Sequence, residues 1–260
     1  MAQCLGLAFA TERIPFATAI APIYAQTTEE FAHQAAYIYE LSGGRFQFGI
    51  GVAHAPSHIR MGVTPGKPLA DIRAFVAKIR SYEGIGALPP IILAALRRRM
   101  IALAAEIGDG LVFANGSRSH MTAALGALPA AKRDDPNFFI GNRIRTCICD
   151  DETEAKAVLR RTVSNYALMP YYRNYWKEAG YVAEMTGVEA AVAEGRLADV
   201  PQYLPDRWLA DITLFGSATK VRDGVEAWRP AGIKTPILVP LSADGDQKTA
   251  LRQVFAAFSD

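Results

Sequence analysis

The stretch Arg45-Phe-Gln-Phe-Gly-Ile-Gly-Val-Ala-His54 decides the fold. Its two phenylalanines and its isoleucine occupy alternate positions, the spacing that places side chains on one face of a β-strand. Gly49 and Gly51 fall on the opposite face, where a missing side chain lets a bulky group approach the strand. We therefore predict a strand over Arg45–Gly51 with one packed face and one face open to close contact.

Predicted strands and helices alternate on both sides of this stretch. Further strands are predicted at Ile14–Ile20, Ile91–Ala95, Leu111–Ala114, within Phe138–Cys149 and at Pro236–Pro240. Helices are predicted at Thr28–Leu41, Leu69–Tyr82, Met100–Ile107, Ser119–Leu128, Glu152–Lys177, Val182–Glu194, Asp206–Ile212, Ala218–Trp228 and Asp246–Phe258. This alternation of about six strands with helices is typical of an α/β protein with a parallel sheet.

The length of the chain favours a barrel. A TIM (β/α)8-type barrel usually takes about 250 residues, and the chain has 260. Residues 159–212 carry helical patterns without a strand pattern. We therefore expect a single barrel domain over residues 1–260, with a helical insertion at about 159–212.

The composition argues against several classes of protein. The 28 basic and 26 acidic side chains nearly balance, so the chain lacks the basic excess of nucleic-acid-binding domains. No apolar run reaches the roughly 18 residues of a membrane helix. Cys4, Cys147 and Cys149 are too few for a disulfide framework, and the last two lack further zinc ligands nearby. We expect a cytoplasmic protein with no metal, no nucleic-acid partner and no membrane partner.

Two segments match a known family. The first is Ser42–Gly51, which has the pattern S-x-G-R-x-x-x-G-x-G. The second begins with Pro89-Pro-Ile-Ile-Leu-Ala-Ala95 and continues to the pattern A-x-E-x-x-D-G at Ala104–Gly110. Together with the turn at Ala231–Leu238, these motifs resemble the bacterial luciferase-like oxidoreductases, which depend on a flavin or on the deazaflavin coenzyme F420.

The resemblance implies a (β/α)8-type barrel that binds FMN or coenzyme F420 at the mouth formed by the carboxyl ends of its strands. It implies hydride transfer to or from a small-molecule substrate, or monooxygenation of it, and a homodimer. Compared with the family, we expect the chain to open within the second helix, at Gln3–Thr11, without the first strand, helix and strand. Because many members carry catalytic groups on the second strand, a non-catalytic cofactor-binding or partner subunit is the alternative.

The resemblance also indicates which residues contact the cofactor. They are Ala19 and Ile20, matching a cis peptide bond behind the ring, Gly51, Val52 and Ala53 in the loop beside the ring, and Ala95, Leu96, Arg97 and Arg99 in the phosphate-binding turn. Independently of the resemblance, the free amides at the start of a helix suit a phosphate, and arginines there add charge-assisted hydrogen bonds. A solvated basic turn is the alternative interpretation of residues 97–99.

Polar residues after two predicted strands are candidates for catalysis and substrate binding. His54 follows the strand that ends at Gly51, a position where barrels carry catalytic groups, and it is suited to donate a hydrogen bond or to act as a general acid. A solvated loop histidine is the alternative. Asn115 and Arg118 follow the strand that ends at Ala114, and we expect them to contact the substrate.

Three further groups have structural interpretations. Pro56 should prevent a helix between His54 and His58, which argues against a metal site built on these two histidines. The aromatic residues within Tyr166–Trp176 favour the packing of a helix pair, with a lid over an apolar substrate as the alternative. A phosphate-binding aldolase or isomerase is disfavoured, because no lysine that could form a Schiff base lies in a predicted strand.

Overall fold

The computed structural model describes residues 1–259, which form two compact units. One unit consists of residues 1–112 and 127–140, and the other consists of residues 113–126 and of residue 141 onward. Strands β5 (Gly110–Ala114) and β6 (Phe139–Ile148) contribute residues to both units. Among the described residues, no helix has the length and apolar character that crossing a bilayer requires.

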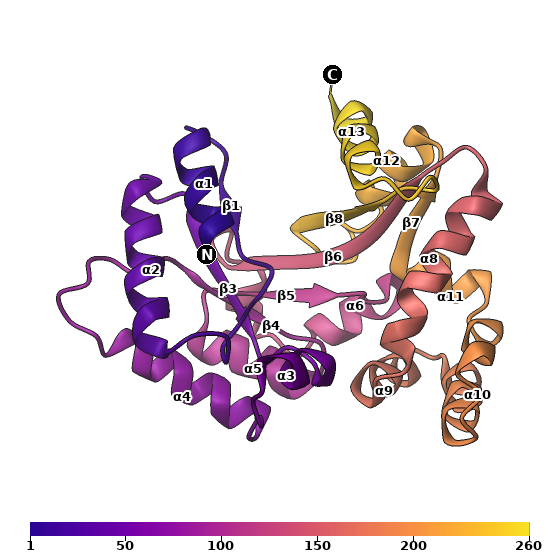
Figure 1. Cartoon of the computed structure of the whole chain (residues 1–260), viewed down its shortest axis with the longest axis horizontal. Coiled ribbons are helices and arrows are strands. Elements are labelled where there is room, and N and C mark those ends of the chain that lie inside the picture. Colours follow the sequence, from indigo (N-terminus) through magenta and orange to yellow (C-terminus); the bar gives the residue numbers. More distant parts are fainter. Residues whose placement is uncertain (260) are drawn as a thin grey trace. The chain divides into compact units, whose positions relative to one another are not determined.

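The first unit consists of short parallel strands flanked by helices (Figure 1). Its strands are β1 (Phe16–Ala17), β2 (Ala21–Pro22), β3 (Phe46–Gly51), β4 (Ile91–Ala94) and the beginning of β5. Its helices are α1 (Ala2–Ala10), α2 (Thr28–Leu41), α3 (Ala55–Met61), α4 (Pro68–Arg80), α5 (Arg98–Ile107) and α7 (Ala130–Arg133). Because β3 pairs in parallel with β1, β2 and β4, and β4 pairs in parallel with β5, the carboxyl ends of these strands lie at one end of the sheet.

Helices α2 and α4 cover the face of β3 that carries the large side chains. The ring of Phe31 on α2 lies 5.5 Å from the ring of Phe48 and 5.8 Å from that of Phe75 on α4, measured between centroids. All three side chains are buried. Thr27 and Glu30 start α2 with a reciprocal capping box, which satisfies two of its free amides. The alternation of large and small residues read from the sequence is confirmed.

Arg45 ties the end of α1 to the start of β3. Its guanidinium donates to the backbone oxygens of Ala8 and Thr11 at 3.2 and 2.7 Å. It also donates to the Thr11 hydroxyl at 2.8 Å, to the Ile14 carbonyl at 2.9 Å and to the Ser42 carbonyl at 2.7 Å. Since the last carbonyls of a helix lack partners within the helix, this fork of charged donors stabilises the end of α1.

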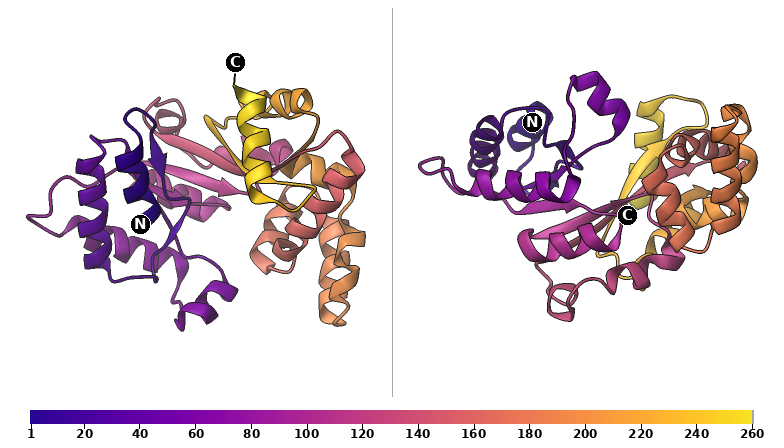
Figure 2. Two further views of the ribbon diagram at one scale, coloured as in Figure 1. Left: turned by 45° about the horizontal axis from the view of Figure 1, so that its top comes forward. Right: turned by 90° about the horizontal axis from the view of Figure 1, so that it is seen from below.

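The second unit carries the helical insertion. Its helices are α6 (Arg118–Leu125), α8 (Glu152–Ala167), α9 (Pro170–Glu178), α10 (Val182–Ala193), the 3-10 helix η1 (Leu197–Tyr203), α11 (Asp206–Ile212), α12 (Ala218–Glu226) and α13 (Gln247–Phe258). Its strands are most of β6, β7 (Thr213–Gly216) and β8 (Thr235–Leu241). Strand β6 pairs in parallel with both β7 and β8, and α12 and α13 lie side by side next to these strands (Figure 2).

Aromatic side chains form the core where α9 and α11 meet. The rings of Trp176 and Trp208 pack edge to face with centroids 4.8 Å apart, and Tyr172 lies 5.3 Å from Trp176. Tyr175 is equally buried. For these residues of α9, the helix-packing interpretation of the aromatic cluster is confirmed.

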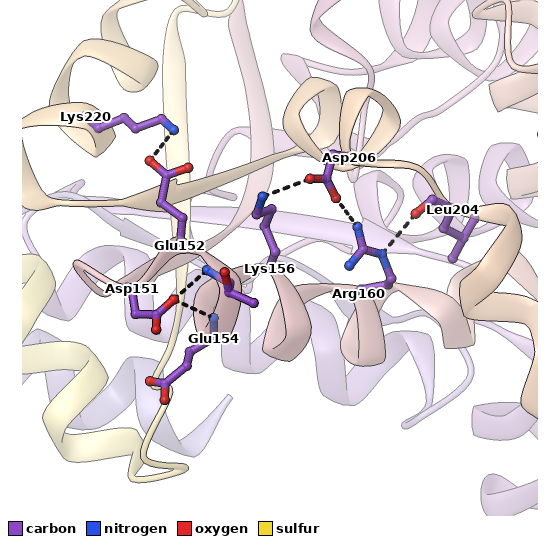
Figure 3. A network of polar contacts seen from close by, with 9 residues as sticks. Asp151, Glu152, Glu154, Lys156, Arg160, Leu204, Asp206 and Lys220 are labelled. Atoms are coloured by element: carbon purple, nitrogen blue, oxygen red, sulfur yellow. Dashed lines mark hydrogen bonds and ion pairs between the residues drawn. The ribbon is translucent and has the colours of Figure 1, made fainter.

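An ion-pair network joins α8 to the helices beside it (Figure 3). Asp206 of α11 accepts hydrogen bonds from Lys156 at 2.8 Å and from the guanidinium of Arg160. Glu152, in the first turn of α8, pairs with Lys220 of α12 at 2.5 Å. The network therefore ties α8 to α11 and to α12.

Besides adding α3, α7 and η1, the structure differs from the predicted elements in three places. The described residues contain eight strands instead of six, because β7 was missed and because Ile14–Ile20 is not one strand but the region of β1 and the bend before β2. Strand β7 has only four residues and follows α11 without a turn, so it carries no separate sequence signal. The predicted helix Glu152–Lys177 is two helices, since Pro170 lacks the amide that a continuous helix needs and instead starts α9.

Replacing Arg45 with lysine should lower the free energy of unfolding by about 2 kcal/mol, because a single ammonium cannot serve the acceptors that the fork of Arg45 reaches. Urea denaturation measures the difference. The exposed Arg13 provides the control, and its replacement with lysine should change stability by less than about 0.5 kcal/mol. Equal stability of the two variants would contradict a stabilising role for the hydrogen bonds of Arg45.

Asp206→Asn should lower the stability most at neutral pH. The hydrogen bonds from Lys156 and Arg160 lower the pKa of Asp206, so the ion pairs stabilise the fold above the ordinary aspartate pKa and are lost as the pH falls through the lowered value. The effect should be at most about 1 kcal/mol, since the carboxylate is exposed.

Urea denaturation of wild type and Asp206→Asn at pH 7 and below pH 4 checks the pH dependence. The difference in stability should be largest at pH 7 and should shrink in acid. No described residue forms an ion pair with the exposed Asp223, and Asp223→Asn serves as the control. A difference for Asp206→Asn that grows in acid would contradict the assignment.

Candidate functional site

Between β1 and β2 the backbone bends across the face of β3. The bend contains a cis peptide bond between Ala19 and Ile20, which confirms the cis bond that the family resemblance implied there. Just before it, the hydroxyl of Thr18 donates to the carbonyl of Gly49 at 2.7 Å. Just after it, β2 pairs with the last residues of β3. Ala19 and Ile20 therefore lie at the carboxyl end of β3.

The two glycines of β3 make room for this bend. A Cβ atom at Gly49 would lie 1.9 Å from the carbonyl oxygen of Thr18. A Cβ atom at Gly51 would lie 2.8 Å from the Cβ of Ala94 and 3.2 Å from the side chain of Ile20. The bulky group expected on the glycine face is therefore the chain itself, which corrects the expectation of an open face.

The loop after β3 contains a strained residue. Ala53 has a φ of 59°, in the left-handed region that a side chain disfavours. Such residues cluster at ligand sites and active sites. His54 follows as the N-cap of α3, where its carbonyl accepts from the amides of Ser57 and His58 at 2.8 and 3.0 Å. The side chain of His54 is half-buried.

Helix α3 corrects the expectation about Pro56. Pro56 lies in the first turn of α3, where its missing N–H costs no hydrogen bond within the helix, so it does not separate the two histidines. The Nε2 atom of His58 lies 2.5 Å from the carbonyl oxygen of Val52, so the imidazole holds the loop in place. Within residues 1–259, no three His, Cys, Asp or Glu side chains are placed to hold a metal ion.

Tyr24 and Asp71 support the same loop and were not identified from the sequence. The ring of Tyr24 packs edge to face against His58 with centroids 5.6 Å apart, and its hydroxyl donates to Asp71 of α4 at 2.6 Å. Burial, together with the hydrogen bond and the charge of Asp71, raises the pKa of Tyr24, which keeps the hydroxyl protonated. No local pattern marks this pair, because its members lie 47 positions apart.

The turn from β4 into α5 carries the predicted phosphate ligands. Ala95 is buried, and its amide donates to the carbonyl of Val112 at 3.0 Å. Leu96 is half-buried, and Arg97 is the N-cap of α5 in an extended conformation. Arg97, Arg98 and Arg99 are exposed, and the first turn of α5 holds no acidic residue.

The residues of this turn fit a phosphate. The first amides of α5 have no acceptor within the helix, and the helix dipole places partial positive charge beside them. Three arginines at a helix start are unfavourable with that dipole, whereas an anion bound there would reverse the sign of the interaction. The donor set consists of amides and guanidinium groups, the groups that bind phosphate oxygens in proteins.

A cavity of about 770 Å³ lies in the first unit beside the cis peptide bond. Its lining includes Ala19 and Ile20, the first residues of α1, and Gln34 and Tyr37 of α2. Among the described residues, none provides a hydrogen-bond partner for the buried Oε1 atom of Gln34. The sequence did not mark this cavity, and of the predicted site residues only Ala19 and Ile20 line it.

The remaining predicted site residues belong to the second unit. Asn115 follows β5, has a φ of 53° and is buried. Its backbone N–H donates to the carbonyl of Arg143 at 3.1 Å. Trp176 of α9 donates its indole N–H to the carbonyl of Asn115 at 3.3 Å. Arg118 is the half-buried first residue of α6. Helix α9 of the insertion therefore covers the loop that carries the two predicted substrate contacts.

Gly49→Ala should destabilise the first unit by about 3 kcal/mol, because the added methyl group would overlap the backbone oxygen of Thr18 rather than a movable side chain. Chemical denaturation measures the loss. Hydrogen exchange should also accelerate at the amide of Ile23, which donates to Gly51 across the bend. In Gly6→Ala, the control on α1, the methyl group meets nothing within 4 Å. If both variants are as stable as the wild type, the bend does not approach β3 as closely as described.

Comparison with known proteins places this arrangement in a family. A family model described as luciferase-like monooxygenase matches residues 1–84 and 77–235. A Mycobacterium tuberculosis protein whose name provisionally assigns it to the coenzyme F420-dependent oxidoreductases is 24% identical over 282 residues, which cover 90% of this chain and 81% of that protein.

Two solved structures share the fold. The coenzyme F420-dependent tetrahydromethanopterin reductase from Methanopyrus kandleri superposes with a TM-score of 0.74 at 16% identity, covering 98% of this chain and 86% of that one. The oxygenating constituent of 3,6-diketocamphane monooxygenase from Pseudomonas putida, in complex with FMN, superposes with a TM-score of 0.56 at 16% identity. The match covers 90% of this chain and 76% of that one.

These neighbours agree with the fold and the cofactors inferred from the sequence. The shared fold is an α/β arrangement of parallel strands and helices of the TIM-barrel type. The cofactors named for the three proteins are coenzyme F420 and FMN, the two that the resemblance implied. Since the family model matches most of its residues, the chain belongs to the family of luciferase-like monooxygenases.

Proposed function

We propose that the chain is an oxidoreductase that uses FMN or coenzyme F420 for hydride transfer to or from a small organic substrate, or for its monooxygenation. Membership of the luciferase-like family supports the class of reaction. The observation that carries the proposal is the start of α5, where the first amides have no acceptor within the helix and three exposed arginines stand in succession.

In this proposal the carboxyl ends of β3 and β4 hold the cofactor. Arg97 and Arg99, with the first amides of α5, bind its phosphate. Ala19 and Ile20, together with the loop from Gly51 to Ala53, contact its ring system. When bound, the cofactor supplies the site at which a hydride is accepted or donated. The left-handed Ala53 directs the loop, and the imidazole of His58 fixes it through the carbonyl of Val52.

His54 is the proposed catalytic residue. It lies at the start of α3 and directly after the glycine-containing end of β3, and its imidazole is half-buried rather than fully solvated. Imidazole side chains are suited to donate a proton or a hydrogen bond to a reacting oxygen. Asn115 and Arg118 are the proposed substrate contacts. The single domain, the homodimer and the cytoplasmic location stay predictions from the sequence.

Titration of the full chain with FMN and with coenzyme F420, followed by fluorescence, tests the proposal. One of the two should bind, and Arg97→Gln and Arg99→Gln should each weaken that binding about tenfold, the equivalent of about 1.4 kcal/mol. Arg13→Gln is the matched control, since Arg13 is an exposed arginine of the same unit. Failure of both cofactors to bind, or unchanged binding by the two variants, would overturn the assignment.

A further inference from the structure

Two arginines lie on one face of β6 in the second unit. Arg143 and Arg145 are separated by one residue, so their side chains leave the strand in the same direction. Both side chains are half-buried, whereas Ile144 and Thr146, on the other face, are fully buried. The strand therefore presents two guanidinium groups together on a partly covered surface.

Neither guanidinium has an acidic partner. Across residues 1–259, no carboxylate lies within ion-pair distance of Arg143 or Arg145. Arg145 donates from Nη2 to the hydroxyl of Tyr166 at 2.6 Å, and its guanidinium carbon lies 4.9 Å from the centroid of that ring. Within the described part of the chain, no atom accepts a hydrogen bond from the buried Nε atom of Arg145.

Other arginines of this unit are neutralised. Arg160 pairs with Asp206, Arg173 pairs with Glu189, and Arg207 pairs with Glu184. Arg173 is the closest comparison because it is buried, and it also donates to a backbone carbonyl at 2.9 Å. The buried Arg173 therefore has a counter-charge, whereas no carboxylate among the described residues pairs with Arg143 or Arg145.

Two like charges without a counter-charge are unfavourable when they are partly removed from water. Burial lowers the pKa of Arg143, and the neighbouring charge of Arg145 contributes in the same direction. An anion held between the two groups would remove both penalties. Guanidinium groups present planar forks of donors that match the oxygens of a carboxylate or a phosphate.

Tyr166, which contacts Arg145, belongs to a group of three packed tyrosines. Tyr166 of α8 and Tyr172 of α9 pack edge to face with ring centroids 5.1 Å apart, and Tyr171 lies 5.0 Å from Tyr172. The charges of Arg143 and Arg145 reach Tyr172, which is buried. These rings offer an apolar wall beside the two forks, as small-molecule sites do.

Helix α9 connects this surface to the predicted substrate contact. The helix carries Tyr171 and Tyr172, and it also carries Trp176, which donates to the carbonyl of Asn115. The amide of Asn115 in turn donates to the carbonyl of Arg143. The loop after β5 and the arginines of β6 are therefore joined through one helix and one backbone hydrogen bond.

We propose that Arg143 and Arg145 bind an oxyanion group of the substrate, with the tyrosines of α8 and α9 against its apolar part. The assignment of this group to the substrate rests on the proposed oxidoreductase function. The substrate class is then a small organic acid or a small phosphate ester. The shared chemistry is one oxyanion bound by two guanidinium groups.

Thermal unfolding of the full chain with inorganic phosphate or with benzoate as the probe tests the site. Either probe should raise the melting temperature of the wild type, and Arg143→Met and Arg145→Gln should each remove most of that rise. In buffer without either anion, Arg143→Met should melt at or above the wild-type temperature, because it removes an unpaired charge. Arg145→Lys should keep part of the effect, since it retains the charge and loses the fork.

Two controls separate this site from others. Arg161→Gln removes an exposed arginine of α8 and should leave the response unchanged. Arg97→Gln with Arg99→Gln removes the proposed cofactor phosphate site of the first unit and should leave the response to benzoate unchanged. A larger response to benzoate than to phosphate identifies a carboxylic acid, and the reverse identifies a phosphate ester.

The proposal is overturned if neither probe raises the melting temperature of the wild type, or if the rise survives in both Arg143→Met and Arg145→Gln. Loss of the rise only in the Arg97 and Arg99 variants would also overturn it. Its failure is distinguishable from that of the proposed function. If both cofactors fail to bind while the anion response still depends on Arg143, the oxidoreductase function falls and the oxyanion site stands.

Discussion

The contact on which the first unit depends is the close approach of one backbone segment to the small face of β3. The Thr18 carbonyl occupies space that any side chain at position 49 would fill. The Thr18 hydroxyl donates a hydrogen bond to the carbonyl of Gly49. With that contact made, β2 resumes pairing at Ile50, and the bend containing Ala19 lies at the carboxyl end of the strand. The opposite face of β3 is free to pack on α2 and α4, so both faces of one strand are used by the fold.

Much of this arrangement could be predicted from the sequence because the signals are local. The alternation over Arg45–Gly51 and the capped helix at Thr28–Leu41 each depend on residues close together in the chain. Strand β7 has four residues and no turn before it, so no local pattern marked it, and the proline in the first turn of α3 argued against a helix there. Prolines at helix starts explain two errors of opposite kind, since Pro56 begins a helix that was not predicted and Pro170 divides one that was.

The candidate site divides in the same way. The cis bond between Ala19 and Ile20 followed only from the family resemblance, since composition and periodicity hold no signal for it. Contacts between distant positions were indicated neither by the family resemblance nor by composition or periodicity. Tyr24 finds Asp71 across 47 residues, and His58 binds a carbonyl that any residue at position 52 would offer. The sequence indicated candidate residues because they follow predicted strands. The side chains that hold the loop after β3 in place, such as Tyr24 and His58, make contacts that depend on the folded structure.

Burial decides how much an arginine without a partner implies. The guanidinium groups at the start of α5 are exposed, so water solvates them, and their meaning depends on the helix amides beside them. Arg143 and Arg145 are partly removed from water on a strand that offers no helix dipole, so the lack of an acidic partner among the described residues is costly there. The basic run at residues 97–99, which is conspicuous in the sequence, therefore supports anion binding less strongly than Arg143 and Arg145 do, although the sequence analysis did not identify those two arginines. The difference lies in the helices of the insertion, which bring aromatic rings to one strand and leave its charges to be balanced by what binds there.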